Sequence, residues 1–209
     1  MDLLKVLDMY INYPIIVKEI TAPCVCHEGD GFCIRAFPLE HTKTCVGYTL
    51  EEYQRPGEFH PEKARELKVP CGPLWAKLQA GCEVEAEDGS IVKPEQVLGP
   101  QRKGRKISYV TDTLYLDSIA KEVANSDLLF CEGMFTKEFE DQAKEKKHMT
   151  SSQAAQIAKD ANVKKMALIH YSPRYNDYDL KPLLTEAQSI FPETILSKDR
   201  MTFEIPNED

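Results

Sequence analysis

The sequence predicts an α/β fold in which a parallel or mixed sheet is covered by helices. From residue 105 onward, strand-like runs alternate with helix-like runs, as they do in sheets built from strand–helix–strand units. Residues 1–51 are rich in short strand-like segments, and a stretch dense in turn formers follows them. With 209 residues, 42% of them hydrophobic and 29% charged, the chain is long enough for one domain with a core.

The first region, residues 1–51, is expected to be mainly β-structure. Apolar residues at helical spacing predict a helix over 3–11 at its start. Two of the strands form a hairpin around Glu28-Gly29-Asp30-Gly31. The expected strands are 13–20, 23–27, 32–39 and 46–50.

The second region, residues 52–104, differs from the first in composition. Proline and glycine recur throughout it, which makes it poor material for a layered core. Short helices are expected at 61–68 and 73–79. We interpret this region as an insertion that projects from the domain.

The third region, residues 105–209, carries the regular alternation of strands and helices. A strand near its end is expected to close the sheet. The expected strands are 106–110, 127–131, 165–169 and 201–205, and the expected helices are 114–124, 136–147, 151–161 and 180–190.

Charge and cysteine content narrow the class of protein. A net charge of -8 argues against a protein that coats nucleic acid nonspecifically, although a local basic site remains compatible with it. The seven cysteines lack the paired spacing of a disulfide scaffold. The sequence has no apolar run of membrane-spanning length, and its start lacks the features of a signal peptide. These observations favour a cytoplasmic protein without a membrane partner.

Four expected strands lead into residues that bind metal ions or transfer protons. Each residue alone is more typical of a structural role, but the carboxyl ends of such strands meet at one edge of a sheet, where ligands bind. Imidazole and carboxylate ligands together suit Zn²⁺ or Mn²⁺. The residues are Glu40 and His41 after 32–39, Asp112 after 106–110, Glu132 after 127–131, and His170 after 165–169.

His148 lies just ahead of an expected helix. Thr150 and Gln153 have the spacing of a capping box, which predicts a helix amino terminus directly after this histidine. Such a terminus favours a phosphate. The alternative is that the box only starts the helix and that His148 is an exposed residue.

Five segments, in consistent order along nearly the whole chain, resemble motifs of the ribonuclease Z family, the tRNA 3′-end endonucleases of the metallo-β-lactamase superfamily. They resemble its middle metal histidine, the Gly-Pro element of its protruding tRNA-binding arm, its bridging aspartate, its His-Ser-Thr motif and its last metal histidine. Thr111 stands where glycine is usual in the aspartate motif. The segments are Pro38-Leu39-Glu40-His41 with Gly47-Tyr48, Pro70-Cys71-Gly72-Pro73, Thr111-Asp112-Thr113, His148-Met149-Thr150 and His170-Tyr171-Ser172-Pro173-Arg174-Tyr175.

The resemblance implies an αββα sandwich of the metallo-β-lactamase type, with residues 52–104 as the arm. Asp112 would bridge two metal ions, zinc or manganese, and His41 and His170 would each bind one of them. His148 would act as a general acid or stabilise the transition state, and Glu132 would orient it. The implied partners are precursor tRNA and a second copy of the chain in a homodimer. Implied substrate contacts are Ser172, Arg174, Gly72 and Pro73.

A basic run where the insertion rejoins the core offers a further contact for RNA phosphates. A solvated surface loop is an equally good interpretation of it. The run comprises Arg102, Lys103, Arg105 and Lys106 around Gly104.

One family motif, His-x-His-x-Asp-His, does not occur in this sequence. His41, Asp112 and His170 shared between two ions leave each ion two protein ligands, whereas catalytic zinc usually has three or more. We therefore expect an incomplete sandwich that binds metal weakly and does not cleave RNA alone. A separate amino-terminal fragment supplying the ligands would complete an enzyme. The alternatives are a noncatalytic RNA-binding protein and another hydrolase of the superfamily.

Overall fold

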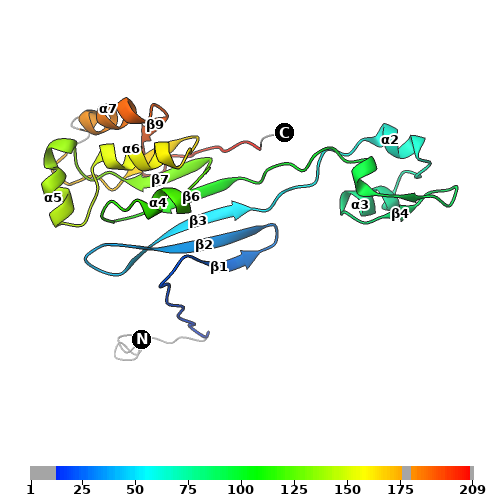
Figure 1. Ribbon diagram of the computed structural model, residues 1–209, viewed down its shortest axis with the longest axis horizontal. Helices are drawn as coiled ribbons and strands as arrows, with labels where there is room; N and C mark the ends of the chain where they lie inside the picture. The colour runs from blue at the N-terminus through cyan, green and yellow to red at the C-terminus, as the bar shows by residue number, and fades with distance from the viewer. Residues whose placement is uncertain (1–12, 176–179, 208–209) are drawn as a thin grey trace.

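The computed structural model describes residues 13–175 and 180–207. Its centre is a seven-stranded mixed sheet in the order β1-β2-β3-β6-β7-β8-β9 (Figure 1). The pairs from β1 to β6 are antiparallel, and those from β6 to β9 are parallel. The strands are β1 (Cys24–Gly29), β2 (Phe32–Leu39), β3 (Cys45–Glu52), β6 (Lys106–Val110), β7 (Leu128–Glu132), β8 (Met166–Ile169) and β9 (Thr194–Leu196).

Helices cover one face of this sheet, where the main core lies (Figure 1). The helix α6 (Ser151–Asp160) buries a run of small and branched apolar side chains, and α4 (Ser118–Glu122) and α7 (Lys181–Ile190) add residues to the same cluster. Every second side chain of the strands packs against these helices, because successive side chains of a strand point to opposite faces of the sheet. The strand contributions include Phe37, Val110, Leu129, Cys131 and Leu168.

The opposite face of the sheet carries aromatic side chains that remain partly exposed. Tyr48, Tyr109 and Phe130 are neighbours across β3, β6 and β7. Tyr48 and Tyr109 are 42% and 45% exposed, and Phe203 packs edge-on against Phe130 at 5.4 Å between ring centroids. This face therefore offers an apolar surface beside the tail of the chain.

The segment between β3 and β6 leaves the sheet and forms a small unit at a distance from it (Figure 1). This unit has its own apolar core, to which Val69, Leu78, Val92 and Val97 contribute. Arg55 pairs with Arg102 and Phe59 with Leu98 where the two connecting segments run side by side. Its elements are α2 (Pro61–Glu66), α3 (Pro73–Gln79), β4 (Val84–Glu85), β5 (Ile91–Val92) and a 3-10 turn, η1 (Pro94–Gln96).

Most expected elements are confirmed, with shifted ends. The expected helix 114–124 is shorter, as α4, and 136–147 divides into a 3-10 turn, η2 (Lys137–Phe139), and α5 (Glu140–Glu145). No helix among the described residues is long and apolar enough to cross a membrane. The expected helix 3–11 lies outside the described residues.

Two expected strands are wrong. Residues 13–20 are not strand, and Cys24–Gly29 forms the edge of the sheet instead. Residues 201–205 are also not strand, because β9 closes the sheet earlier in the chain. The later segment instead follows a turn from Lys198 to Met201, and the Ile205 carbonyl accepts a hydrogen bond from Arg105 Nη1 rather than from a strand.

Candidate metal centre and active site

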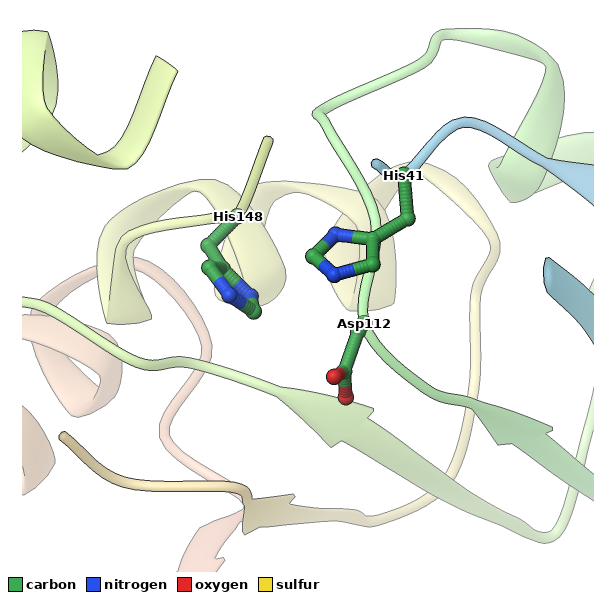
Figure 2. A group of neighbouring side chains, drawn as sticks. All are labelled: His41, Asp112 and His148. Carbon is green, nitrogen blue, oxygen red and sulfur yellow. The ribbon is translucent and has the colours of Figure 1, made fainter. Parts of the chain in front are cut away.

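The candidate site lies at one edge of the sheet, where β2, β6, β7 and β8 end. His41 follows β2, Asp112 follows β6, and His148 lies between α5 and α6. One ligand atom from each of these three residues lies within 4.8 Å of the others. Figure 2 shows the three side chains around a common space, each carried by a different segment. The prediction that metal-competent residues gather at this edge agrees with these positions.

The ring of His41 is oriented by a backbone carbonyl. Its Nδ1 lies 2.9 Å from the Lys147 oxygen, and a carbonyl can only accept, so Nδ1 carries the proton. In the neutral ring Nε2 is then the unprotonated nitrogen, and this is the form of histidine that binds a metal ion. Lys147 Nζ also pairs with Glu40 Oε1 at 3.0 Å, so the residues preceding the two histidines are joined as well.

Glu132 organises the centre of the site. Its carboxylate is fully buried and accepts hydrogen bonds from the backbone N–H groups of Thr113 and Met149. His148 Nδ1 lies 3.1 and 3.2 Å from the two carboxylate oxygens. One buried acid therefore joins the segment after β6, the end of β7 and the segment before α6.

The same carboxylate controls the protonation of His148. Burial is the largest single effect and disfavours the charged imidazolium, but the hydrogen bond and negative charge of Glu132, together with the negative charge of Asp112, outweigh it, and the pKa of His148 is raised. With Nδ1 occupied by Glu132, Nε2 is the nitrogen directed to other groups. His148 can thus carry a proton at the site.

His170 comes next to Asp112 from the end of β8. Its Nε2 lies 3.5 Å from Asp112 Oδ2, and its ring centroid lies 5.2 Å from that of His148. The backbone of His170 has φ of 58°, a left-handed conformation that is uncommon outside glycine, although asparagine, aspartate and histidine adopt it more often than other residues do. Strained backbone of this kind gathers at functional sites. Thr111 Oγ1 donates to Asp112 Oδ1 at 3.1 Å.

These residues fit a borderline metal ion such as zinc. His41 offers an oriented, unprotonated Nε2, and Asp112 offers carboxylate oxygens beside His170. A mixed imidazole and carboxylate set is typical for Zn²⁺ and Mn²⁺.

The seven cysteines are free, none in a disulfide, and burial raises the pKa of the Cys131 thiol well above its usual value.

The two predicted substrate contacts after His170 lie in different environments. Ser172 is buried, and its backbone N–H donates to the Met134 carbonyl at 3.1 Å. Arg174 is exposed, and its Nη2 donates to Gln142 Oε1 at 2.8 Å. The structure thus exposes Arg174 to solvent and buries Ser172.

The other predicted contacts lie away from the metal cluster. Gly72 and Pro73 begin α3, with Gly72 in a conformation (φ 137°) that favours glycine. Arg102 Nε donates to the Pro56 carbonyl at 3.0 Å, and Lys103 Nζ lies 3.4 Å from the Asn125 carbonyl. Arg105 is held at both ends of its guanidinium by the Glu52 carboxylate, so its charge is compensated within the protein.

Two supports of the site were not predicted. The Lys147 carbonyl that orients His41 leaves no mark in the sequence, because every residue has a carbonyl. A weak signal does exist in the opposite charges of Glu40 and Lys147, each directly before a site histidine. For Phe139 and Gln142, the sequence contains no pattern that indicates their contact with Arg174.

Comparisons with known proteins agree with this fold. A family model described as a Beta-lactamase superfamily domain matches residues 84–171. The metallo-β-lactamase fold protein YhfI from Bacillus subtilis has a TM-score of 0.58 at 19% identity, over 97% of this chain and 62% of that one. Human tRNase Z, short form, has a TM-score of 0.53 at 22% identity, over 88% of this chain and 47% of that one. The protein therefore has the metallo-β-lactamase fold.

Sequence relatives narrow the class further. A ribonuclease Z from Treponema denticola is 65% identical over 98% of this chain and 67% of its own length. One from Treponema pallidum is 61% identical over 94% of this chain and 64% of its own length. The chain belongs to the ribonuclease Z family, and it spans about two thirds of the length of these relatives.

Proposed function

We propose that this chain is the carboxyl-terminal part of a metal-dependent endoribonuclease that removes the 3′ trailer from precursor tRNA. The observation that carries the proposal is the gathering of His41, Asp112 and His148 within 4.8 Å at one edge of the sheet, with His170 beside Asp112. Membership of the ribonuclease Z family supplies the substrate class.

In this proposal Asp112 would be shared between two zinc or manganese ions, and His41 and His170 would each hold one of them. The bound metal would supply Lewis-acid activation of water near neutral pH and would offset negative charge on a phosphodiester. Asp112 follows β6 and His170 follows β8, the two strands on either side of β7, and this sheet order fixes their spacing. The Lys147 carbonyl holds His41 in the tautomer that leaves Nε2 available.

We propose that His148 donates a proton to the leaving oxygen or stabilises the charge that develops on the phosphate. Its raised pKa keeps the imidazole protonated to a higher pH than usual, and a protonated histidine donates but does not bind metal. Glu132 orients the ring through Nδ1. The capping box of Thr150 and Gln153 begins α6 two residues later, next to a helix terminus that favours an anion.

We further propose that this chain is inactive alone and is completed by an amino-terminal segment with the His-x-His-x-Asp-His motif. His41, Asp112 and His170 leave two ions with two ligands each, which is below the usual number for catalytic zinc. The partly exposed face with Tyr48 and Tyr109 is a surface for such a segment to cover. The greater length of the relatives supports this proposal.

Residues 52–104 are proposed to be a separate arm that holds the tRNA, between fold portions 1–51 and 105–209. The support is that this segment has its own core and extends from the sheet (Figure 1). Gly72 and Pro73 at the start of α3 are the proposed contact element, with Arg102, Lys103 and Arg105 near the neck. Arg105 makes the weakest of these contacts because Glu52 occupies its guanidinium.

A noncatalytic RNA-binding protein is the second candidate function. It is favoured by the absence of the His-x-His-x-Asp-His motif from this sequence together with the intact core of the arm. The two candidates share the arm and differ in whether the metal cluster is used. We also propose a homodimer, as the family resemblance implies, and a cytoplasmic location, where free thiols stay reduced.

Zinc titration by calorimetry, with precursor tRNA binding measured in parallel, tests the proposal. The chain is expected to bind precursor tRNA and to bind zinc only weakly, and Asp112→Asn should abolish the zinc heat while leaving RNA binding unchanged. Asp141→Asn, at an exposed site on α5, is the matched control and should change neither. Absence of tRNA binding would contradict the substrate assignment, and zinc binding unaffected by Asp112→Asn would contradict the metal assignment.

A further inference from the structure

Arg174 is held in place by two aromatic rings and an amide. Its guanidinium carbon lies 4.3 Å from the centroid of the Phe139 ring and 5.0 Å from that of Phe135. Its Nη2 donates to Gln142 Oε1 at 2.8 Å. Arginine stacks on aromatic faces through its planar cation, so an exposed and otherwise flexible side chain has a defined orientation here.

One of the two rings that hold Arg174, that of Phe135, also contacts His148. The Phe135 ring is fully buried and meets the His148 ring edge-on, with centroids 6.5 Å apart. Arg174 and His148 thus pack against one rigid ring. Because close-packed interiors transmit small displacements, the position of the cation is defined relative to the imidazole.

The backbone that carries Arg174 is also tied to the segment that carries the rings. The Ser172 N–H donates to the Met134 carbonyl at 3.1 Å, and the Thr136 N–H donates to the Tyr175 hydroxyl at 3.2 Å. These bonds lie on either side of Arg174 in the chain. These hydrogen bonds therefore fix the backbone of Arg174. The aromatic and amide contacts fix its guanidinium.

We propose that Phe139 and Gln142 are positioning residues that hold the Arg174 guanidinium ready for a phosphate of the RNA substrate. This inference rests on the proposed function, because it names residues that prepare the same site for that substrate. Holding a long side chain in its bound geometry lowers the entropy lost on binding. The guanidinium has five N–H donors, so the bond to Gln142 leaves others for a phosphate.

The contact with Phe139 favours this role over simple core packing. Phe139 is only half-buried, whereas Phe135 belongs to the buried interior. An exposed cation–π contact adds little to stability. Among residues 13–175 and 180–207, the Arg174 guanidinium donates a hydrogen bond to Gln142 Oε1 and forms no ion pair with a carboxylate. Within this described part of the chain its charge is therefore not compensated by an acid, which leaves it available to an anionic ligand.

A double-mutant cycle on precursor tRNA affinity tests the proposal. Arg174→Met should weaken binding roughly five- to tenfold and lower the slope of log affinity against log salt by about one, as expected for one lost phosphate contact. Phe139→Leu and Gln142→Leu should each weaken binding about two- to fivefold, the size expected for a lost cation–π or polar contact. In the Arg174→Met background, neither should have any further effect.

Phe203→Leu is the matched control, because it makes the same change at a half-buried ring on the other face of the sheet. It should leave affinity unchanged. Losses from Phe139→Leu that persist in full without Arg174 would overturn the proposal, because the ring would then act independently of the arginine.

Rotation of the Arg174 guanidinium, measured by nitrogen-15 NMR of the free chain, separates this inference from the proposed function. We expect slow rotation that Phe139→Leu accelerates severalfold and Phe203→Leu does not change. Rotation equally fast in all variants would overturn the positioning role. Slow, Phe139-dependent rotation in a chain that binds no precursor tRNA would support the held arginine and overturn the proposed substrate instead.

Discussion

The buried carboxylate of Glu132 contacts the imidazole of His148 through both of its oxygens, at 3.1 and 3.2 Å from Nδ1. The same carboxylate accepts the backbone N–H groups of Thr113 and Met149. One residue thus connects the protonation of the proposed acid to the geometry of the loop that carries Asp112. This double role predicts that stability and protonation change together when Glu132 is replaced.

Glu132→Ala should lower the free energy of unfolding by about 3 kcal/mol, because two buried N–H groups and a buried imidazole lose their acceptor. The pKa of His148 should fall, since burial then acts without the opposing charge. Urea unfolding and NMR titration measure the two effects. Glu145→Ala, at an exposed site on α5, should change neither, and an unchanged His148 pKa in Glu132→Ala would contradict this role.

His170→Asn should separate function from stability. Asparagine tolerates the left-handed backbone at this position (φ 58°) better than histidine does. The free energy of unfolding should therefore be unchanged or higher by up to about 1 kcal/mol. Zinc affinity should fall by at least roughly tenfold, as for the loss of a site residue. Calorimetry and urea unfolding test both, with His27→Asn on the exposed edge strand as control. A large loss of stability with unchanged zinc binding would indicate a structural histidine.

The ion pair between Glu52 and Arg105 should make stability depend on pH. Hydrogen bonds from the Arg105 side chain and backbone lower the pKa of Glu52 to about 2, below its value in the unfolded chain. The stabilisation is therefore complete above about pH 4.5 and is lost as pH falls toward 2. Because Arg105 is 40% exposed, solvent screening limits the effect to about 1 kcal/mol.

Glu52→Gln should accordingly be less stable than the wild type by about that amount at pH 7, with the difference shrinking as pH is lowered to 3. Denaturant unfolding at several pH values measures it. Glu58→Gln, at an exposed position, should show no such pH-dependent difference in the free energy of unfolding from the wild type. A Glu52→Gln deficit that stays constant across this range would contradict the linkage.

Gly104→Ala should disturb the junction between the arm and the sheet. A methyl group at Gly104 would lie 2.2 Å from the Glu52 carbonyl oxygen, so the two connecting segments would have to separate. Overpacking of this kind destabilises by about 1–3 kcal/mol. Gly99→Ala in the same region meets nothing closer than 3.5 Å and serves as the control. Equal stability of the two variants by thermal unfolding would show that the junction is not tightly packed.

The position of the candidate site could be predicted because it depends on strand ends. His41, Asp112 and His170 each follow a strand with a clear apolar pattern, and strands running in the same direction end at the same edge. The Thr150 capping box was equally local, and the structure contains both of its hydrogen bonds.

The features that were missed depend on tertiary contacts. Residues 201–205 have a strand-like pattern but form a tail, because Phe203 packs on Phe130 and Ile205 accepts from Arg105. The support of His41 by the Lys147 carbonyl joins positions 106 residues apart. No local pattern specifies such a contact.

Cleavage of precursor tRNA by the purified chain in the presence of zinc tests the central claim most directly. The assay compares the chain alone with the chain plus the part of the Treponema denticola relative that this chain does not match, and repeats the mixture with Asp112→Asn. We predict no cleavage by the chain alone, cleavage at the 3′ trailer by the mixture, and none with Asp112→Asn. Cleavage by the chain alone, or cleavage by the mixture that survives Asp112→Asn, would contradict the account.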